Sequence, residues 1–382
     1  MAEFIFIVST VLIVYTYLLY PLGIFLLALA RGRNRPVDRL PASDLPPVTF
    51  VISVFNEENR IAGKVENIRS LDYPQEKIRI VIVSDGSTDN SNQVLEELAE
   101  AGQISAIFLD ERQGKPNALN IAMSRVDTEV VAFADIRQVI ADDALANLIS
   151  ELKSDPAIGL VSSELVHTAT DGSTSANVGL YWKYEKWIRH CESDYRSTVG
   201  TTGAFYVIHR EDYVTLRDDV ILDDFEIPMN IVRAGKQAKI SKRALIYDSA
   251  HDDLGKEKIR KLRTLSGNYQ SFLRMKWLFS PGRNPLFLQF VSHKFLRLLI
   301  PYFLLSALLA NLAILDQSVL YVLTFAIQIL FYALALLARF NAKVRSIRVA
   351  NFCLVFVELN TTVIHALYRY LTNQTQVTWS KT

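Results

Sequence analysis

The charged residues of this chain are unevenly distributed, and this distribution limits the possible folds more than any other feature. No charged side chain occurs between Phe4 and Ala30, a stretch longer than the about 20 apolar residues that cross a bilayer as a helix. A cleaved signal peptide would begin with positive charge and have a shorter apolar core, whereas Met1–Glu3 contains no Lys or Arg. We therefore predict a transmembrane helix over residues 1–30.

A second charge-poor region runs from about Phe295 to Leu371. Its apolar runs predict three more transmembrane helices, at Phe295–Leu315, Val319–Ala338 and Val349–Leu371. Basic residues follow the first helix and fill the loop before the last one (Arg31, Arg33, Arg35, Arg339, Lys343, Arg345 and Arg348). Because cytoplasmic loops are enriched in Lys and Arg, we expect an integral protein of a bacterial-type inner (plasma) membrane, with a cytoplasmic central domain and both termini outside.

The last apolar segment contains Glu358, Asn360 and His365. Polar groups at that depth usually face a partner helix or a pathway, so interhelical hydrogen bonds and a lining for a lipid or sugar chain both remain open. The predicted order is then a helix at 1–30, a cytoplasmic linker at 31–46, an α/β domain at 47–275, an interfacial amphipathic segment at 276–294, three helices within 295–371 and a tail at 372–382.

Composition excludes two classes of protein. Lys and Arg total 41 against 40 Asp and Glu, a formal charge of +1, so we expect no nucleic-acid partner. The two cysteines, Cys191 and Cys353, lie in regions of very different character and cannot form a disulfide framework. Reduced surroundings are therefore expected for the central domain.

Short β-branched runs alternate with helical patterns in the central domain. Strands are predicted at Val48–Val54, Ile78–Val83, Ala106–Leu109 and Val130–Phe133, with a helical pattern at Ser91–Glu100. Such alternation predicts a mostly parallel sheet whose ligands bind at the carboxyl ends of the strands. The candidate functional residues of this half of the domain all lie at such ends.

Three of these strand ends carry residues suited to a nucleotide. Asp85 precedes Gly86 in a turn that opens a helix, where its carboxylate can accept from a base or ribose, although such turns also simply cap helices. Asp135 suits a hard divalent cation that bridges a diphosphate. Lys115 suits the phosphates themselves, the alternative being a solvated loop lysine. The sequence thus predicts a diphosphate site.

Adjacent carboxylates, Asp223 and Asp224, precede a helical pattern at Ile227–Ala234. Acids at a helix start are favoured by the helix dipole, so a structural role is plausible. Alternatively, one of them takes the proton from an acceptor hydroxyl.

Together these motifs resemble glycosyltransferase family 2, in the branch that contains hyaluronan, chitin and cellulose synthases. The resemblance spans about Pro47 to Gln270. Its motifs stand in the family's order: Val54-Phe55-Asn56-Glu57-Glu58, Asp85, Gln113-Gly114-Lys115 with Ala118-Leu119-Asn120, Asp135, Thr201-Thr202-Gly203-Ala204-Phe205 and Asp224. One helix before the domain and three after it look like the layout of nodulation chitooligosaccharide synthases.

The resemblance implies a GT-A (nucleotide-diphospho-sugar transferase) fold and a role for each matching residue. Asn56, Glu58, Asp85, Lys115 and Arg260 would contact the nucleotide donor, expected to be a UDP-sugar. Asp135 matches the second acid of the Asp-x-Asp motif that holds Mg²⁺ or Mn²⁺. The remaining matches place Thr202, Gly203 and Asp223 at the acceptor, Asp224 as the catalytic base and Arg263 at the diphosphate.

Two positions depart from the family pattern. Phe133 replaces the first acid of Asp-x-Asp, which would weaken contacts to ribose or metal. Thr264 follows Arg263 where processive synthases have the tryptophan that covers the acceptor, so stacking of a growing polymer is not expected there. Four helices are also few for a polymer channel, which leaves a homo-oligomer open.

The expected activity is therefore metal-assisted, inverting transfer of a sugar to a growing oligo- or polysaccharide. The alternative acceptor is a membrane lipid, either a polyprenyl phosphate or a ceramide-like or diacylglycerol molecule. A third hypothesis, suggested by Phe133 and Thr264, is an inactive scaffold. The presence of Asp85, Asp135 and Asp224 in one chain argues against it.

Overall fold

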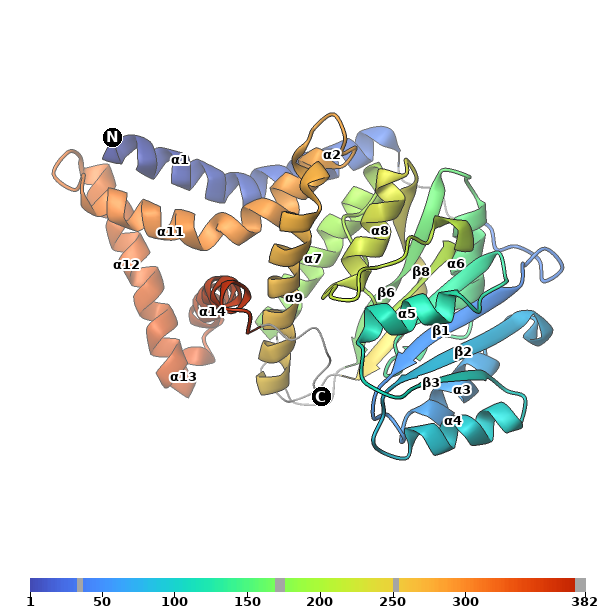
Figure 1. The fold of residues 1–382 in the computed structure, drawn as a ribbon. Coiled ribbons are helices and arrows are strands. Elements are labelled where there is room, and N and C mark those ends of the chain that lie inside the picture. The colour runs from blue at the N-terminus through green and yellow to red at the C-terminus, as the bar shows by residue number, and fades with distance from the viewer. Residues whose placement is uncertain (33–36, 169–175, 250–253, 375–382) are drawn as a thin grey trace.

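A computed structural model describes residues 1–32, 37–168, 176–249 and 254–374. The predicted linker positions 33–36, with Arg33 and Arg35, and the tail from 375 onwards lie outside the described residues. The chain has two parts: a sheet with helices on both faces, and a group of long helices that extends away from it (Figure 1).

An eight-stranded sheet forms the centre of the first part, in the order β3-β2-β1-β4-β7-β6-β8-β5. The strands are β1 (Val48–Val54), β2 (Ile78–Asp85), β3 (Ser105–Leu109), β4 (Val130–Ala134), β5 (Val139–Ile140), β6 (Ile158–Thr168), β7 (Phe205–His209) and β8 (Gln237–Ser249). β1 to β4 are mutually parallel, β7 is antiparallel to β4, and β6 is parallel to β8. The expectation of a mostly parallel sheet is confirmed, and the carboxyl ends of β1, β2, β3 and β4 share one edge.

Side-chain alternation along the strands builds two cores. In β1, Phe50 and Ile52 face one core while Val51 faces the other, as the two-residue period of a strand requires. The first core includes α3 (Ile61–Arg69), α4 (Ser91–Glu100) and α6 (Ala144–Lys153), and the second includes α5 (Lys115–Met123), α8 (Asp223–Arg233) and α9 (Leu254–Arg274). Both faces of the sheet are therefore covered, which is the usual state of parallel strands.

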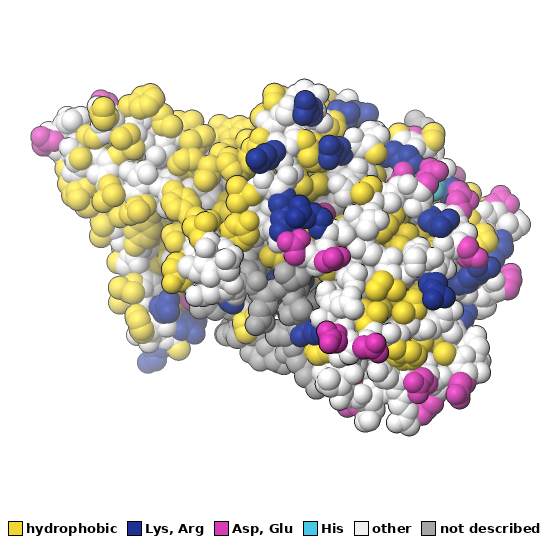
Figure 2. Space-filling view, in the orientation of Figure 1, with side chains coloured by type: hydrophobic (Ala, Val, Ile, Leu, Met, Phe, Trp, Pro, Cys, Tyr) yellow, Lys and Arg dark blue, Asp and Glu magenta, His cyan; other side chains and the backbone are white. Residues whose placement is uncertain are grey.

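Among the described residues, four helical stretches of the second part are long and apolar enough to cross a membrane: Ala2–Arg31, Phe287–Leu312, Val319–Phe340 and Arg348–Leu371. They comprise α1 (Ala2–Val14), η1 (Tyr15–Leu19), α2 (Tyr20–Arg31), α10 (Phe287–Gln289), η5 (Phe290–Phe295), α11 (Leu296–Leu312), α12 (Val319–Phe340) and α14 (Arg348–Leu371). The second stretch begins at Phe287 rather than Phe295, so part of the segment predicted to lie along the interface is continuous with it. Figure 2 shows hydrophobic side chains gathered over this part, whereas charges cover the sheet domain.

Pro21 explains the π-helical turn η1 in the first stretch. A proline inside a helix clashes with the carbonyl four residues earlier and cannot donate to it, and here that carbonyl belongs to Tyr17. The widened turn η1 ends two residues before Pro21. The freed oxygen of Tyr17 accepts a hydrogen bond of 2.6 Å from the Tyr184 hydroxyl of α7 (Ala176–Tyr195). The first helix is thereby fixed to the sheet domain.

A second contact between the two parts is a buried group of charged and polar residues, here called the junction cluster: Tyr20, Glu185, Glu192, His293, Lys294 and Arg297. Glu192 accepts from Tyr20 at 2.5 Å and contacts His293 at 2.8 Å. Glu185 contacts the other ring nitrogen of His293 at 2.8 Å and pairs with Arg297. Three chain segments, α2, α7 and η5–α11, are joined at this point.

The polar residues of α14 differ in their surroundings. Asn360 is buried and donates to the Phe356 carbonyl of its own helix at 2.8 Å. Glu358 and His365 are exposed. The pairing of α14 with the sheet domain instead uses its backbone, since Ser266 of α9 donates to the Ala366 carbonyl at 3.2 Å.

Candidate active site

Five charged residues meet at the carboxyl-end edge of the sheet and are here called the active-site cluster: Lys115, Asp135, Asp223, Asp224 and Arg263. Asp135 follows β4, Lys115 begins α5, and the two remaining acids begin α8. The Lys115 ammonium lies 2.9 Å from Asp135 Oδ1 and 3.0 Å from Asp223 Oδ2. Residues more than 100 positions apart thus share one site, as the predicted topology requires.

Asp85 positions Lys115 indirectly. Its carboxylate, at the end of β2, accepts from the backbone N–H of Gln113 at 2.7 Å and of Gly114 at 2.9 Å. Gly114 has φ 94°, a conformation that side chains disfavour, and it immediately precedes α5. A Cβ on Gly86 would lie 2.6 Å from the Arg112 nitrogen. The loop before Lys115 therefore packs directly on the turn after β2, and Asp85 holds it there.

Asn56 and Glu58 hold the other side of the same turn. Asn56, at φ 56°, accepts from Thr88 N–H at 2.7 Å through its side-chain oxygen. Glu58 accepts from Asn90 N–H at 3.0 Å, directly before α4. These side chains lie at the predicted edge and shape the turn. Their contact with a nucleotide, like that of Asp85, stays a prediction.

The surroundings of Asp224 suit a base. Burial and the neighbouring charge of Asp223 raise the pKa of Asp224 to about 6, against the opposite effect of Lys115 and Arg263. Its backbone carbonyl accepts from Thr201 N–H at 3.0 Å. A Cβ on Gly203, which has φ 72°, would lie only 2.8 Å from Asp224 Oδ2. Gly203 of the predicted acceptor loop therefore lies directly against the carboxylate of Asp224, the predicted base.

Arg263 and Arg260 lie one turn apart on α9. Arg263 donates to the Ile221 carbonyl at 3.0 Å, and its charge acts on Asp224. Arg260 is half-buried on the same helix. Arg263 lies near the acids of the active site, where its match to the family motif places it. The contact of Arg260 or Arg263 with a nucleotide donor stays a prediction.

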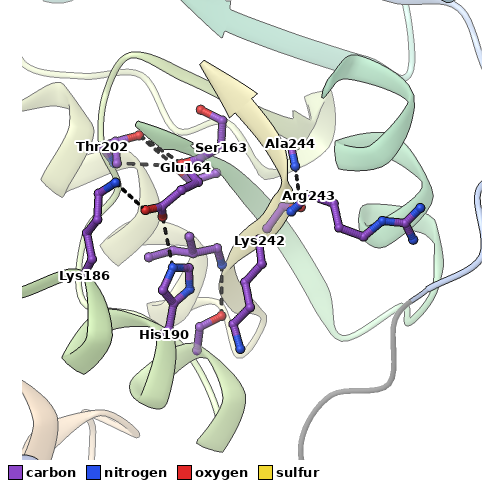
Figure 3. Close-up of polar contacts among 12 residues, drawn as sticks. Ser163, Glu164, Lys186, His190, Thr202, Lys242, Arg243 and Ala244 are labelled. Carbon is purple, nitrogen blue, oxygen red and sulfur yellow. Dashed lines mark hydrogen bonds and ion pairs between the residues drawn. The ribbon is translucent and has the colours of Figure 1, made fainter. Parts of the chain in front are cut away.

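Thr202 connects the predicted acceptor loop to β6. Its hydroxyl lies 3.1 Å from Ser162 Oγ and donates to the Ser163 carbonyl at 3.4 Å. Figure 3 shows the next residue, Glu164, between two side chains of α7, Lys186 at 2.7 Å and His190 at 3.1 Å. This ion-paired group was not predicted from the sequence, because its members are far apart in the chain and carry no motif.

Tyr206 was also not predicted. It stacks on Phe133, with ring centroids 5.1 Å apart. Phe133, which stands in place of the first acid of Asp-x-Asp, therefore packs against a core residue beside the active-site cluster. Burial first, and then the charge of Asp223, raises the pKa of the Tyr206 hydroxyl well above its ordinary value. In the sequence this tyrosine reads as an ordinary core residue of a strand, and only its position after the acceptor loop distinguishes it.

A separate cavity of about 1120 Å³ contains none of the residues that were assigned a role, although Asn120 of the Ala118-Leu119-Asn120 motif lines it. It is lined by residues that include Glu129 before β4 and His209 at the end of β7. Since β7 runs antiparallel to β4, both positions lie at the sheet edge opposite to Asp135. Lys236 lines this cavity and bridges Glu211 at 3.2 Å and Asp212 at 2.7 Å.

The acids fit a metal that is shared with a substrate. Within the described ranges, no group of three or more His, Cys, Asp or Glu residues is arranged to hold a metal ion. Asp135 and Asp223 nevertheless direct two carboxylate oxygens at one point, the Lys115 nitrogen. Mg²⁺ in particular is commonly bound by one or two carboxylates, with phosphates and water completing its shell. The two carboxylates fit a metal ion that is also bound by phosphates and water. They do not by themselves form a complete metal site.

Comparisons with known proteins agree with this geometry. Residues 49–213 match the family model described as Glycosyl transferase family 2. The chain is 22% identical over 257 residues to a poly-beta-1,6-N-acetyl-D-glucosamine synthase of Staphylococcus epidermidis, covering 64% of this chain and 61% of that protein. A protein of the same name from Staphylococcus aureus (strain MSSA476) is 30% identical over 129 residues, covering 34% of this chain and 31% of that protein. The matches span about three fifths or less of these relatives.

Among solved structures, the chain is similar to the mannosyltransferase PcManGT from Pyrobaculum calidifontis in complex with GDP-Man and Mn²⁺. The TM-score is 0.72 at 23% identity, with coverage of 98% of this chain and 99% of that chain. This likeness concerns the fold, and it extends over the sheet domain and the long helices alike. The fold expected from the sequence is confirmed.

Proposed function

We propose that this chain, which carries a glycosyltransferase family 2 domain over residues 49–213, transfers a sugar from a nucleoside-diphosphate donor to a carbohydrate acceptor. The observation that carries the proposal is the active-site cluster, where three acids and two cations from four distant segments meet at the carboxyl-end edge of the sheet. Polysaccharide synthesis is the supported reaction class, because the curated relatives are named poly-beta-1,6-N-acetyl-D-glucosamine synthases.

In the proposed mechanism, Asp224 takes the proton of the acceptor hydroxyl as the oxygen attacks the anomeric carbon. A pKa of about 6 keeps this carboxylate largely ionised at neutral pH and still basic enough to accept a proton. Gly203 leaves room beside Asp224 for the acceptor, since any Cβ there would contact the carboxylate. Attack opposite to the leaving diphosphate inverts the configuration in one step.

Departure of the diphosphate requires compensation for its growing negative charge. Lys115 and Arg263 supply two cations beside Asp224. A bound Mg²⁺ or Mn²⁺, held by Asp135, would add Lewis-acid stabilisation of the same charge. A divalent metal is supported by the fit of the acids and by the similar mannosyltransferase, whose structure was solved in complex with GDP-Man and Mn²⁺. We retain a UDP-sugar as the expected donor.

The test uses the purified full chain in nanodiscs with a panel of nucleotide sugars, and measures release of free nucleoside diphosphate and product mass. Asp224→Asn should retain donor binding and lose transfer. Chelation of divalent metal should stop turnover. Full activity of the variant would remove Asp224 from its role, and full activity in chelator would do the same for Asp135.

A lipid acceptor is the second candidate, and one observation favours it. The helix that carries Arg263 also contacts α14, through the hydrogen bond from Ser266 to Ala366. An acceptor that arrives from the membrane would therefore reach the site along α9. Partition of labelled product between organic solvent and water distinguishes the two acceptors.

We also propose that the four long apolar helices cross a membrane and that the sheet domain faces the cytoplasm. The basic residues on either side of α13 (Ala342–Arg345) support this orientation. Alkaline phosphatase fused after Thr382 should be active outside the cytoplasm. An active cytoplasmic reporter at that position would instead reverse the proposed topology.

A further inference from the structure

We infer that the Lys115 ammonium occupies the place of a divalent cation between Asp135 and Asp223, so that metal binds only together with a nucleoside diphosphate that draws Lys115 away. This inference rests on the proposed function, because it concerns the order in which that site is filled. Lys115 would thus bind the two carboxylates before the nucleotide arrives and the phosphates afterwards. Asp223 would help to hold the lysine in the first of these positions.

The geometry places the lysine directly on the acids. Lys115 Nζ is 2.9 Å from Asp135 Oδ1 and 3.0 Å from Asp223 Oδ2, and its side chain is only 12% exposed. Mg²⁺ would need carboxylate oxygens at about 2.0–2.1 Å. A metal ion and the ammonium cannot both lie between these two oxygens, for reasons of size as well as charge.

Two carboxylates hold the Lys115 ammonium at hydrogen-bond distance. Only another anion can compete with the two carboxylates for it, and a diphosphate is such an anion.

The backbone around Lys115 is fixed, so the exchange involves its side chain. Asp85 holds the N–H groups of Gln113 and Gly114 in place. Lys115 is the first residue of α5, whose second residue, Pro116, has no N–H, and the remaining N–H groups of a helix start attract phosphate. A diphosphate bound there would meet the lysine without movement of the helix, and its oxygens would supply the metal ligands that the protein lacks.

The experiment measures Mn²⁺ binding by the loss of the free-ion electron paramagnetic resonance signal, with the full chain in nanodiscs and without any sugar acceptor. For the unmodified protein, UDP or GDP should tighten Mn²⁺ binding at least about 10-fold, and Mn²⁺ should tighten nucleotide binding by the same factor, since such coupling is reciprocal. Equal Mn²⁺ affinity with and without nucleotide would overturn the inference.

Lys115→Met provides the decisive variant. Removal of the ammonium leaves two carboxylates facing one point, so Mn²⁺ alone should bind at least about 10-fold more tightly than to the unmodified protein, while metal-free nucleotide binds more weakly. In Lys115→Met/Asp223→Asn the gain in Mn²⁺ affinity should disappear. A Lys115→Met protein with unchanged Mn²⁺ affinity contradicts the inference.

Lys236→Met is the matched control, because Lys236 also bridges two acids but lies at the opposite edge of the sheet. Its Mn²⁺ binding should not change, and a gain equal to that of Lys115→Met would show a general carboxylate effect instead. Should Lys115→Met fail to fold, Lys115→Gln tests the same idea, since it removes the charge and keeps a polar side chain: nucleotide-free Mn²⁺ binding should tighten, and unchanged binding contradicts the inference.

These binding measurements are independent of turnover. Nucleotide-coupled Mn²⁺ binding without sugar transfer would refute the proposed function and leave the inference intact. Transfer activity together with tight nucleotide-free Mn²⁺ binding would support the proposed function and refute the inference.

Discussion

The active-site cluster and the junction cluster both consist mainly of buried and half-buried charged residues, yet their charges are balanced differently. In the junction cluster, His293, Lys294 and Arg297 surround two acids, and Glu185 alone contacts all three. In the active-site cluster, three acids face two cations. The junction is neutralised by its own members, whereas the active site has an excess of negative charge.

The pKa values express this difference. Burial would raise the pKa of Glu185, but Arg297 and His293 hold it well below its ordinary value. At Asp224, burial and Asp223 prevail and the pKa rises to about 6. Buried charge that is fully paired joins parts of a protein, while buried charge in excess is available to a proton or a cationic ligand.

The largest expected effect sharpens this contrast at Asp224. Asp224→Asn should lower kcat by about 10²–10⁴-fold, because the proton of the acceptor is no longer removed. The same change should stabilise the protein at pH 8 by roughly 1–3 kcal/mol, since it removes the buried excess charge. Product release measures the loss of kcat, and thermal unfolding measures the gain in stability. A variant that is inactive and also less stable would mean that Asp224 is a structural residue.

Removing charge from the junction should have the opposite consequence. Glu185→Ala leaves Arg297 buried without its carboxylate, and loss of one member of a buried pair costs about 3–5 kcal/mol. Unfolding in denaturant should show this loss, while nucleotide-coupled Mn²⁺ binding of the folded fraction stays unchanged. Glu211→Gln, at an exposed ion pair, should change stability by less than about 1 kcal/mol. Equal losses in both variants would abolish the distinction between the clusters.

Gly203→Ala tests the space beside the base. The added Cβ would lie 2.8 Å from Asp224 Oδ2 at a φ of 72°, so the loop or the carboxylate must move. A displacement of about 1 Å at a reacting group can cost about 10²-fold in rate. We expect a loss of that order in kcat, with donor binding retained. Gly102→Ala, where nothing lies within 4 Å of the Cβ despite φ 70°, controls for backbone strain.

The smallest effect is the pH dependence. With a folded pKa of about 6 against an ordinary value of 3.8, Asp224 contributes stability below pH 4 that is lost as the pH rises through 6. Activity follows the opposite course, because the base must be ionised: kcat/KM should fall about tenfold per unit below pH 6. A profile that is flat from pH 5 to 8 would place the titrating group elsewhere.

The parallel sheet and the position of the acids at its edge could both be predicted from one feature of the sequence. Apolar runs such as Val130–Ala134 end in polar residues, and parallel strands bring those ends to one edge, so Asp85 and Asp135 were placed without knowledge of any contact. Asp223 was assigned to the acceptor, but its ion pair with Lys115 was not foreseen. Which acid a lysine contacts depends on side-chain packing across segments that have no common periodicity.

The junction cluster could not be predicted from the sequence. Glu185 and Glu192 lie two turns apart on α7 and look like the polar face of an amphipathic helix. Their partner His293 is 101 residues beyond Glu192, in a stretch predicted to lie along the membrane interface. The π-helical turns η1 and η5 lie next to Tyr20 and around His293, and neither has a sequence signal except Pro21, which follows η1.

The hydrogen bond between Tyr184 and the Tyr17 carbonyl has a consequence for the lipid surroundings. A helix whose apolar length exceeds the hydrocarbon thickness tilts in the bilayer, and the first helix here is anchored near its middle to α7. The far end of α7 follows β6, whose Ser162 and Ser163 contact the acceptor loop. Acyl-chain length would therefore act on the loop that carries Thr202 through this hydrogen bond and through the Tyr20–Glu192 contact, and Tyr184→Phe would make turnover less sensitive to bilayer thickness.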